Sequence, residues 1–142
     1  MNDSILIVPA CEPCRGGGHL VRCMTLVKEL RALGRETFLC LNSDKNNLLQ
    51  TADFDRSWII TEAALHEKKW DIIVLDRFQT PEEELSRWKQ IAPVIGIDEG
   101  GIGRDRFDFL IDILPNIEKI KPNISDPALL PLPAKKQSLS FK

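Results

Sequence analysis

The sequence lacks an excess of charge of either sign, and it has no long apolar run. Lysine and arginine together number 19 against 21 acidic residues, which leaves a net charge of -2. So small a charge attracts neither nucleic acid nor an anionic membrane, and we expect no such partner. The apolar run over residues 5–10 is too short to span a bilayer, and Asp3 stands where a secretory signal would carry a positive charge. These absences predict a cytoplasmic protein.

Cysteine is also scarce, with four residues at positions 11, 14, 23 and 40. The chain has 142 residues, of which 43% are hydrophobic and 28% charged. A chain of this size and composition builds one globular domain with its own core and needs no disulfide framework. We therefore expect thiols, with Cys40 in the core. The three tryptophans are too dispersed to form a stacking platform, and His66 is expected on the surface of a helix.

The first part of the chain reads as a strand, a glycine loop and a helix. The run from Ser4 to Val8 is apolar and rich in β-branched residues, which is typical of a buried parallel strand. Three glycines follow it. Apolar residues then recur at helical spacing from Leu20 to Leu33, until Gly34 ends the pattern.

The same alternation continues along the chain. Thr80 as the N-cap, Pro81 at the first helical position and Glu83 closing a capping box predict a helix over 81–92. The other expected elements are strands over 37–41, 57–60, 70–75, 94–97 and 107–112, and short helices over 43–49 and 62–68. Strands that alternate with helices predict an α/β fold, a Rossmann-like doubly wound and mainly parallel sheet.

The composition changes towards the C-terminus. Five of the nine prolines fall at 115, 122, 127, 131 and 133. Proline disfavours regular structure and favours an extended path. We therefore expect residues 1–115 to form the Rossmann-like domain, and residues 116–142 to be a proline-rich linker or tail that adds little to the sheet.

The segment from Arg15 to Cys23, RGGGHLVRC, lies between the first predicted strand and helix. In open α/β sheets ligands bind at this edge, because helix-start N–H groups favour anions and glycine allows close backbone approach. A helix dipole also disfavours the charged form of His19, which leaves a neutral imidazole able to take a proton from water. A plain strand-to-helix turn with a capping histidine fits the same residues.

Two other chemistries fit this segment. Cys11 and Cys14 form a C-x-x-C pair after a strand, as in thioredoxin-like redox proteins. Together with His19 and Cys23 they also approach the spacing of a zinc knuckle. A knuckle is an independent module, whereas a buried strand and a helix bound this segment. We expect no metal and no cofactor.

The residues Gly16-Gly-Gly-His19-Leu-Val-Arg22-Cys23 resemble the G-x-G-H-x-x-R-C motif of a nucleotide-sugar hydrolase family. That family removes UDP from UDP-2,4-diacetamido-2,4,6-trideoxy-altropyranose in pseudaminic acid biosynthesis, and related proteins are labelled spore coat polysaccharide proteins. Two later stretches are similar in order and spacing, Ile72–Phe78 and Ile95–Asp112. The resemblance covers about residues 4–133.

The resemblance implies one half of a B-type glycosyltransferase-like fold, with the active site between two Rossmann-like halves. His19 matches the base that activates water for attack at the sugar C1. Gly16, Gly17 and Gly18 would let the backbone approach the substrate, and Arg22 would hold the loop or an anion. Asp76 and Asp98 would line the cleft from strand ends.

Where the family often has an aromatic hydroxyl, this chain has Phe78, and it contains no tyrosine. The family's UDP-binding half would follow the linker, so the resemblance implies that residues 1–142 are an N-terminal half that lacks the second nucleotide-binding domain. The expected partners are a UDP-sugar substrate and a C-terminal half-domain. The main alternative is a sugar-binding or partner-binding half-domain without turnover. Asp76 and Asp98 also fit a plainer reading, as residues that form strand-end turns.

Overall fold

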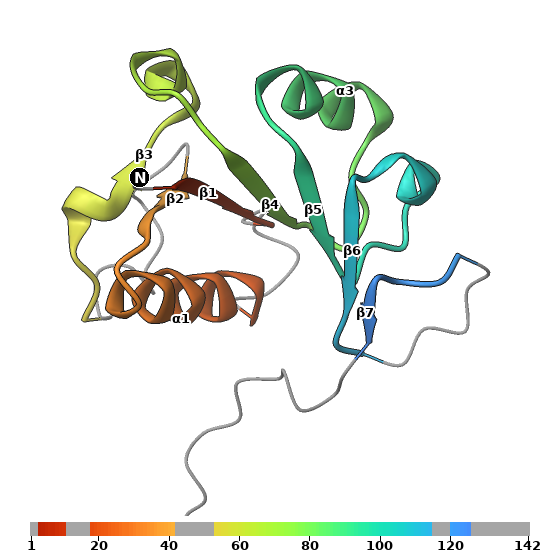
Figure 1. The fold of residues 1–142 in the computed structure, drawn as a ribbon, viewed down its shortest axis with the longest axis horizontal. Coiled ribbons are helices and arrows are strands. Elements are labelled where there is room, and N and C mark those ends of the chain that lie inside the picture. The colour runs from red at the N-terminus through yellow and green to blue at the C-terminus, as the bar shows by residue number, and fades with distance from the viewer. Residues whose placement is uncertain (1–2, 11–17, 42–52, 115–119, 126–142) are drawn as a thin grey trace, which may run out of the picture.

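The computed structural model describes residues 3–10, 18–41, 53–114 and 120–125 (Figure 1). Their strands are β1 (Ser4–Pro9), β2 (Glu36–Cys40), β3 (Ile59–Ile60), β4 (Ile72–Asp76), β5 (Val94–Ile97), β6 (Phe109–Asp112) and β7 (Ile124–Ser125). Their helices are α1 (Gly18–Ala32) and α3 (Glu82–Ile91), with the 3-10 turns η1 (Arg56–Trp58), η2 (Glu62–Glu67) and η3 (Arg104–Arg106).

The strands form one sheet in the order β3-β2-β1-β4-β5-β6-β7, and every described pairing is parallel. The chain first builds outwards from β1 to β3 and then returns to add β4 on the other side of β1. Helices α1 and α3 lie on opposite sides of this sheet (Figure 1). The predicted α/β, Rossmann-like fold is confirmed.

Alternate residues of β1 face the two layers. Ile5 and Ile7 belong to the apolar cluster that contains Leu20 and Val27 of α1. Leu6 and Val8 belong to the second cluster, which contains Leu85 and Trp88 of α3. Because successive strand residues point to opposite faces, a continuous apolar run is what a strand covered on both faces requires. The sheet is therefore buried by a helix on each side.

The start of α3 differs from the prediction. Pro81 is the N-cap residue and no side chain caps the helix, whereas the sequence predicts Thr80 as the cap. The Thr80 hydroxyl instead donates to Glu99 Oε2 at 2.9 Å. The hydroxyl that the sequence assigns to capping the helix therefore bonds to a buried carboxylate in another loop.

Other local predictions were closer. Cys40 is buried among apolar side chains, and His66 is exposed in η2, as expected. The predicted strand over 57–60 is half 3-10 turn, the predicted helix over 62–68 is the 3-10 turn η2, and the predicted strand over 107–112 begins only at Phe109. The short helix predicted over 43–49 lies outside the described residues.

The sheet also extends further than the sequence predicts. Within the segment expected to add little to it, β7 pairs with β6, Ile124 with Ile111 and Ser125 with Asp112. Asn123 fixes the start of this strand, because its backbone N–H donates to Leu110 O at 2.9 Å and its side-chain Oδ1 accepts from Leu110 N at 2.7 Å. These two bonds offset the low strand propensity of a proline-rich stretch.

Replacing Asn123 by alanine is expected to lower the free energy of unfolding by about 0.5–1.5 kcal/mol, because the Leu110 N–H loses the bond to this side chain. Urea denaturation followed by tryptophan fluorescence measures the loss. Asn123→Asp keeps an oxygen at the same place and serves as the control. Equal stability of the alanine and aspartate variants would contradict the role given to this side chain.

Candidate functional site

A polar cluster lies where the order of the strands reverses, between β1 and β4. Asp76 is the last residue of β4, paired with Pro9 at the end of β1, and His19 and Arg22 lie in the first turns of α1, which follows β1. Asp98 follows the end of the neighbouring strand β5. Ligands of doubly wound folds bind at such a reversal, outside the carboxyl ends of the strands.

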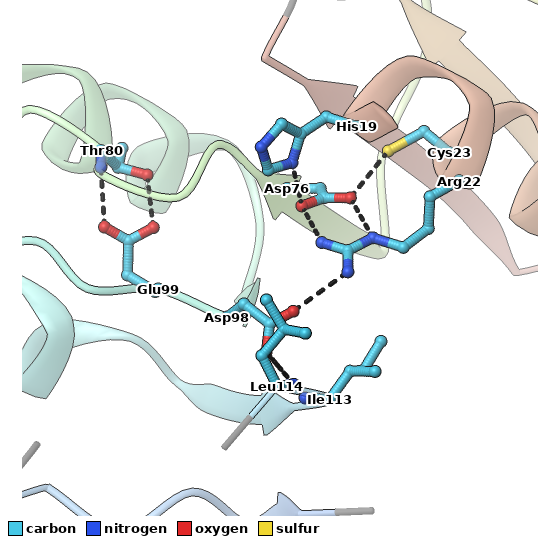
Figure 2. Close-up of polar contacts among 9 residues, drawn as sticks. All are labelled: His19, Arg22, Cys23, Asp76, Thr80, Asp98, Glu99, Ile113 and Leu114. Atoms are coloured by element: carbon cyan, nitrogen blue, oxygen red, sulfur yellow. Dashed lines mark hydrogen bonds and ion pairs between the residues drawn. The ribbon is translucent and has the colours of Figure 1, made fainter. Parts of the chain in front are cut away.

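His19 and Asp76 form the centre of this cluster (Figure 2). His19 Nδ1 lies 2.9 Å from Asp76 Oδ1, and the exposed fraction of the side chain is 22% for His19 and 0% for Asp76. A carboxylate only accepts hydrogen bonds, so Nδ1 carries the proton. The other ring nitrogen, Nε2, points away from the carboxylate (Figure 2). In the neutral form of the ring, this arrangement leaves Nε2 as a proton acceptor on the partly exposed side.

Arg22 bridges the two aspartates. Its Nε and Nη2 donate to the two oxygens of Asp76, and its Nη1 donates to Asp98 Oδ2 at 3.0 Å. Burial by itself lowers the pKa of Arg22, but hydrogen bonds and charge attraction from Asp76 and Asp98 outweigh burial and raise the pKa overall. The guanidinium therefore stays charged and takes no proton from water.

Asp98 ties this cluster to the next strand. Its Oδ1 accepts from the backbone N–H groups of Ile113 and Leu114, at 2.7 and 2.9 Å, while its Oδ2 accepts from Arg22. Its backbone has a φ of 48°, in the left-handed region that few residues with a side chain occupy. Such a conformation persists where the surrounding contacts hold it, and it occurs often at functional sites.

The charges of the cluster do not favour an anion. Arg22 is paired with the carboxylates of Asp76 and Asp98, so these three side chains together carry no net positive charge. Both aspartates are almost completely buried, and all four of their oxygens contact protein groups, the Cys23 thiol included, whose Sγ lies 3.5 Å from Asp76 Oδ2. In this structure the aspartates position other side chains.

The structure brings together His19, Arg22, Asp76 and Asp98, four of the seven residues predicted for the site. Gly18, a fifth, is the first residue of α1 and is exposed, and a Cβ there would meet no atom within 4 Å. Its lack of a side chain is therefore not a packing requirement. Gly16 and Gly17 lie outside the described residues.

The redox and zinc alternatives depend mainly on Cys11 and Cys14, which also lie outside the described residues. Over the described ranges, no group of three or more potential metal ligands is found. Cys23 is buried and its thiol faces Asp76. Its position one turn after His19 is explained by that contact.

Sequence reasoning missed Glu99 as part of the site. Glu99 is completely buried next to Asp98, and Thr80 is its main partner (Figure 2). An acidic residue in a glycine-rich turn gives no sign of burial.

A separate hollow of about 450 Å³ lies between η2 and the end of α3, lined by Leu65, His66, Arg87 and Trp88 among others. Because η2 precedes β4 and α3 precedes β5, this hollow is at the amino ends of the strands. None of the five predicted site residues that the structure describes lines it. Polar chemistry and strand topology, and not the size of a hollow, mark the candidate site.

A search of family models, curated proteins and solved structures finds no match to this chain. No helix within the described residues is long and apolar enough to cross a membrane.

Proposed function

We propose that this chain is the N-terminal, water-activating half of a UDP-sugar hydrolase in surface-glycan biosynthesis. The observation that carries the proposal is the bond between His19 Nδ1 and the buried Asp76. Such a pair makes a general base, because the carboxylate orients the ring and stabilises the imidazolium that forms when Nε2 takes a proton. The choice of a UDP-sugar rests on the resemblance of residues 16–23. A cytoplasmic location belongs to the same proposal.

In the proposed reaction His19 Nε2 takes a proton from water as the water oxygen attacks the sugar C1. A C1–O bond forms to water, the bond from C1 to the diphosphate oxygen breaks, and UDP leaves with the electron pair. Asp76 orients the ring, and Arg22 fixes the positions of Asp76 and Asp98 relative to each other. The departing diphosphate needs electrostatic stabilisation, which the described cluster does not offer. A C-terminal, UDP-binding half is the proposed source.

Incubation with the UDP-sugar of the resembled family tests this proposal. Residues 1–142 are assayed alone and together with a UDP-binding half of that family, and UDP release is measured. Reaction in H2¹⁸O identifies the bond that breaks. UDP without label supports attack at C1, whereas label in the phosphate of UDP would overturn it. Sugar binding without UDP release in every combination would favour the non-catalytic half-domain.

His19→Ala is expected to lower turnover of the assembled enzyme by at least ~10²-fold, the lower range for loss of a general base. His66→Ala is the matched control, because His66 is exposed in η2 at the other end of the sheet. Initial rates of UDP release compare the two variants. Turnover that survives His19→Ala would refute the assigned base.

A further inference from the structure

Glu99 is a fully buried acid that the proposed mechanism does not use. Its Oε1 accepts from the backbone N–H of Thr80 at 2.7 Å and of Gly101 at 3.3 Å, and its Oε2 accepts from the Thr80 hydroxyl at 2.9 Å. A Cβ on Gly101 would lie 2.7 Å from Glu99 Oε1. The carboxylate is thus held on both sides, by one residue from each of two loops. We call these contacts the Glu99 clasp.

The Glu99 clasp joins the loop that follows β4 to the loop that follows β5 (Figure 2). A further bond from Gly100 N to Phe78 O, at 2.7 Å, joins the same two loops. These loops continue from the strand ends that carry Asp76 and Asp98. The clasp therefore fixes the spacing between the ends of β4 and β5, where Asp76 and Asp98 bind Arg22.

Both loops contain a residue in the left-handed region of backbone conformation. Phe78 has a φ of 67° and Asp98 a φ of 48°. Phe78 lies two residues before Thr80, and Asp98 directly precedes Glu99. Residues with side chains keep such conformations only where neighbouring contacts determine them. The clasp provides these contacts beside both strained positions.

We infer that Glu99 is a positioning residue, which acts through Asp98, Arg22 and Asp76 to hold the His19 imidazole. Each step is a direct contact: Glu99 follows Asp98 in the chain, Asp98 accepts from Arg22, and Arg22 and His19 both bond to Asp76. When the clasp is lost, the buried N–H of Thr80 has no acceptor, and the loop after β5 has to move to satisfy it. Asp98 then moves with the loop. The catalytic part of this inference rests on the proposed function.

The chain contains two histidines, His19 and His66, so ¹⁵N NMR of the imidazole rings reports on the site and supplies its own control. In Glu99→Ala, the His19 ring signals are expected to shift away from those of the Nδ1-protonated, carboxylate-bonded form, while the His66 signals stay unchanged. In Glu99→Gln the amide oxygen still accepts from Thr80 N, and the amide nitrogen donates to the Thr80 hydroxyl, which is able to accept. That variant is expected to restore the His19 signals.

Turnover of the assembled enzyme is expected to follow the same order, with a loss of up to ~10²-fold in kcat for Glu99→Ala and little change in KM, since small misplacements of a catalytic group have effects of this size. Thr80→Val removes one bond of the clasp and Thr80→Ser retains it, which provides a milder pair if Glu99→Ala does not fold. The valine variant is expected to shift His19 and the serine variant is not.

A folded Glu99→Ala or Thr80→Val protein with unchanged His19 signals would overturn the inference. If the variants shift the His19 signals but the unaltered chain releases no UDP with any partner half, the clasp is supported and the hydrolase proposal is refuted. The two failures are therefore distinguishable.

Discussion

Replacing Arg104 by methionine is expected to lower the free energy of unfolding by about 3–5 kcal/mol, the cost of leaving one member of a buried ion pair without its partner. The exposed fraction of the side chain is 4% for Arg104 and 2% for Asp112. Methionine has a similar length and no charge, so packing changes little while the charge disappears. The loss would make this one of the most destabilising single substitutions in the chain.

The magnitude follows from the number of bonds that Arg104 makes. Nη1 and Nη2 donate to the two oxygens of Asp112, at 2.9 and 2.7 Å. Nε and Nη2 donate to Ile120 O, and Nη1 also donates to Glu99 O. The side chain therefore connects the loop after β5, the end of β6 and the segment that leads into β7. Without it, the buried carboxylate of Asp112 loses the two bonds from Arg104, and the carbonyls of Glu99 and Ile120 lose the bonds that this side chain donates.

Urea denaturation measured by tryptophan fluorescence tests this expectation. Arg106→Met is the matched control, because Arg106 is exposed in the same 3-10 turn and its guanidinium donates to Ser86 at the surface; its loss is expected to be about 0.5 kcal/mol or less. The double variant Arg104→Met with Asp112→Leu should be more stable than Arg104→Met alone, because it also removes the buried charge that Arg104 neutralises. Equal losses for Arg104→Met and Arg106→Met would contradict the importance of the buried pair.

Asp76→Asn is expected to lower turnover of the assembled enzyme on the order of 10⁴-fold, as expected when a catalytic histidine is left in the wrong tautomer. Both oxygens of Asp76 accept from Arg22, and Oδ1 also accepts from His19. Whichever way the new amide is turned, its NH₂ group faces an N–H donor. With the NH₂ towards His19, the ring carries its proton on Nε2 and no longer accepts one from water.

Two measurements separate this effect from simple misfolding. UDP release gives the turnover, and the ¹⁵N shifts of His19 give the tautomer in the folded variant. Asp71→Asn is the control on the same stretch of chain, since Asp71 precedes β4 and an amide oxygen still accepts from Ser4 N. Turnover of Asp76→Asn within about tenfold of the unaltered chain would refute the role of the His19–Asp76 pair.

Much of the fold could be predicted because its signals are local. The apolar run of β1, the helical spacing of α1 and the end of that helix before Gly34 each depend on neighbours along the chain, and the structure has all three. The strand order was not readable from these signals. Alternation of strands and helices predicts a parallel sheet, but the return past β1 to place β4 beside it is a property of the whole chain.

Local rules failed where a distant group competed for the same atoms. Thr80 has the sequence context of an N-cap, yet Glu99, 19 residues away, accepts hydrogen bonds from both its hydroxyl and its backbone N–H. The stretch before β7 contains proline, yet Asn123 bonds Leu110 on the neighbouring strand. In both cases a buried polar group had to be satisfied, and that requirement outweighed the local preference.

The sequence by itself pointed to His19, Arg22, Asp76 and Asp98 as candidate site residues, but not to Glu99. His19 was identifiable from its position at a helix start after a glycine-rich turn, whereas Arg22, Asp76 and Asp98 were predicted from the resemblance of their stretches to the hydrolase family. Only the tertiary structure decided what they do to one another. Arg22 meets Asp76 and Asp98 across 54 and 76 residues of chain, because parallel strands bring their carboxyl ends to one edge. Burial at that edge then requires each charge to find a partner, and this turns four separate residues into one network around His19.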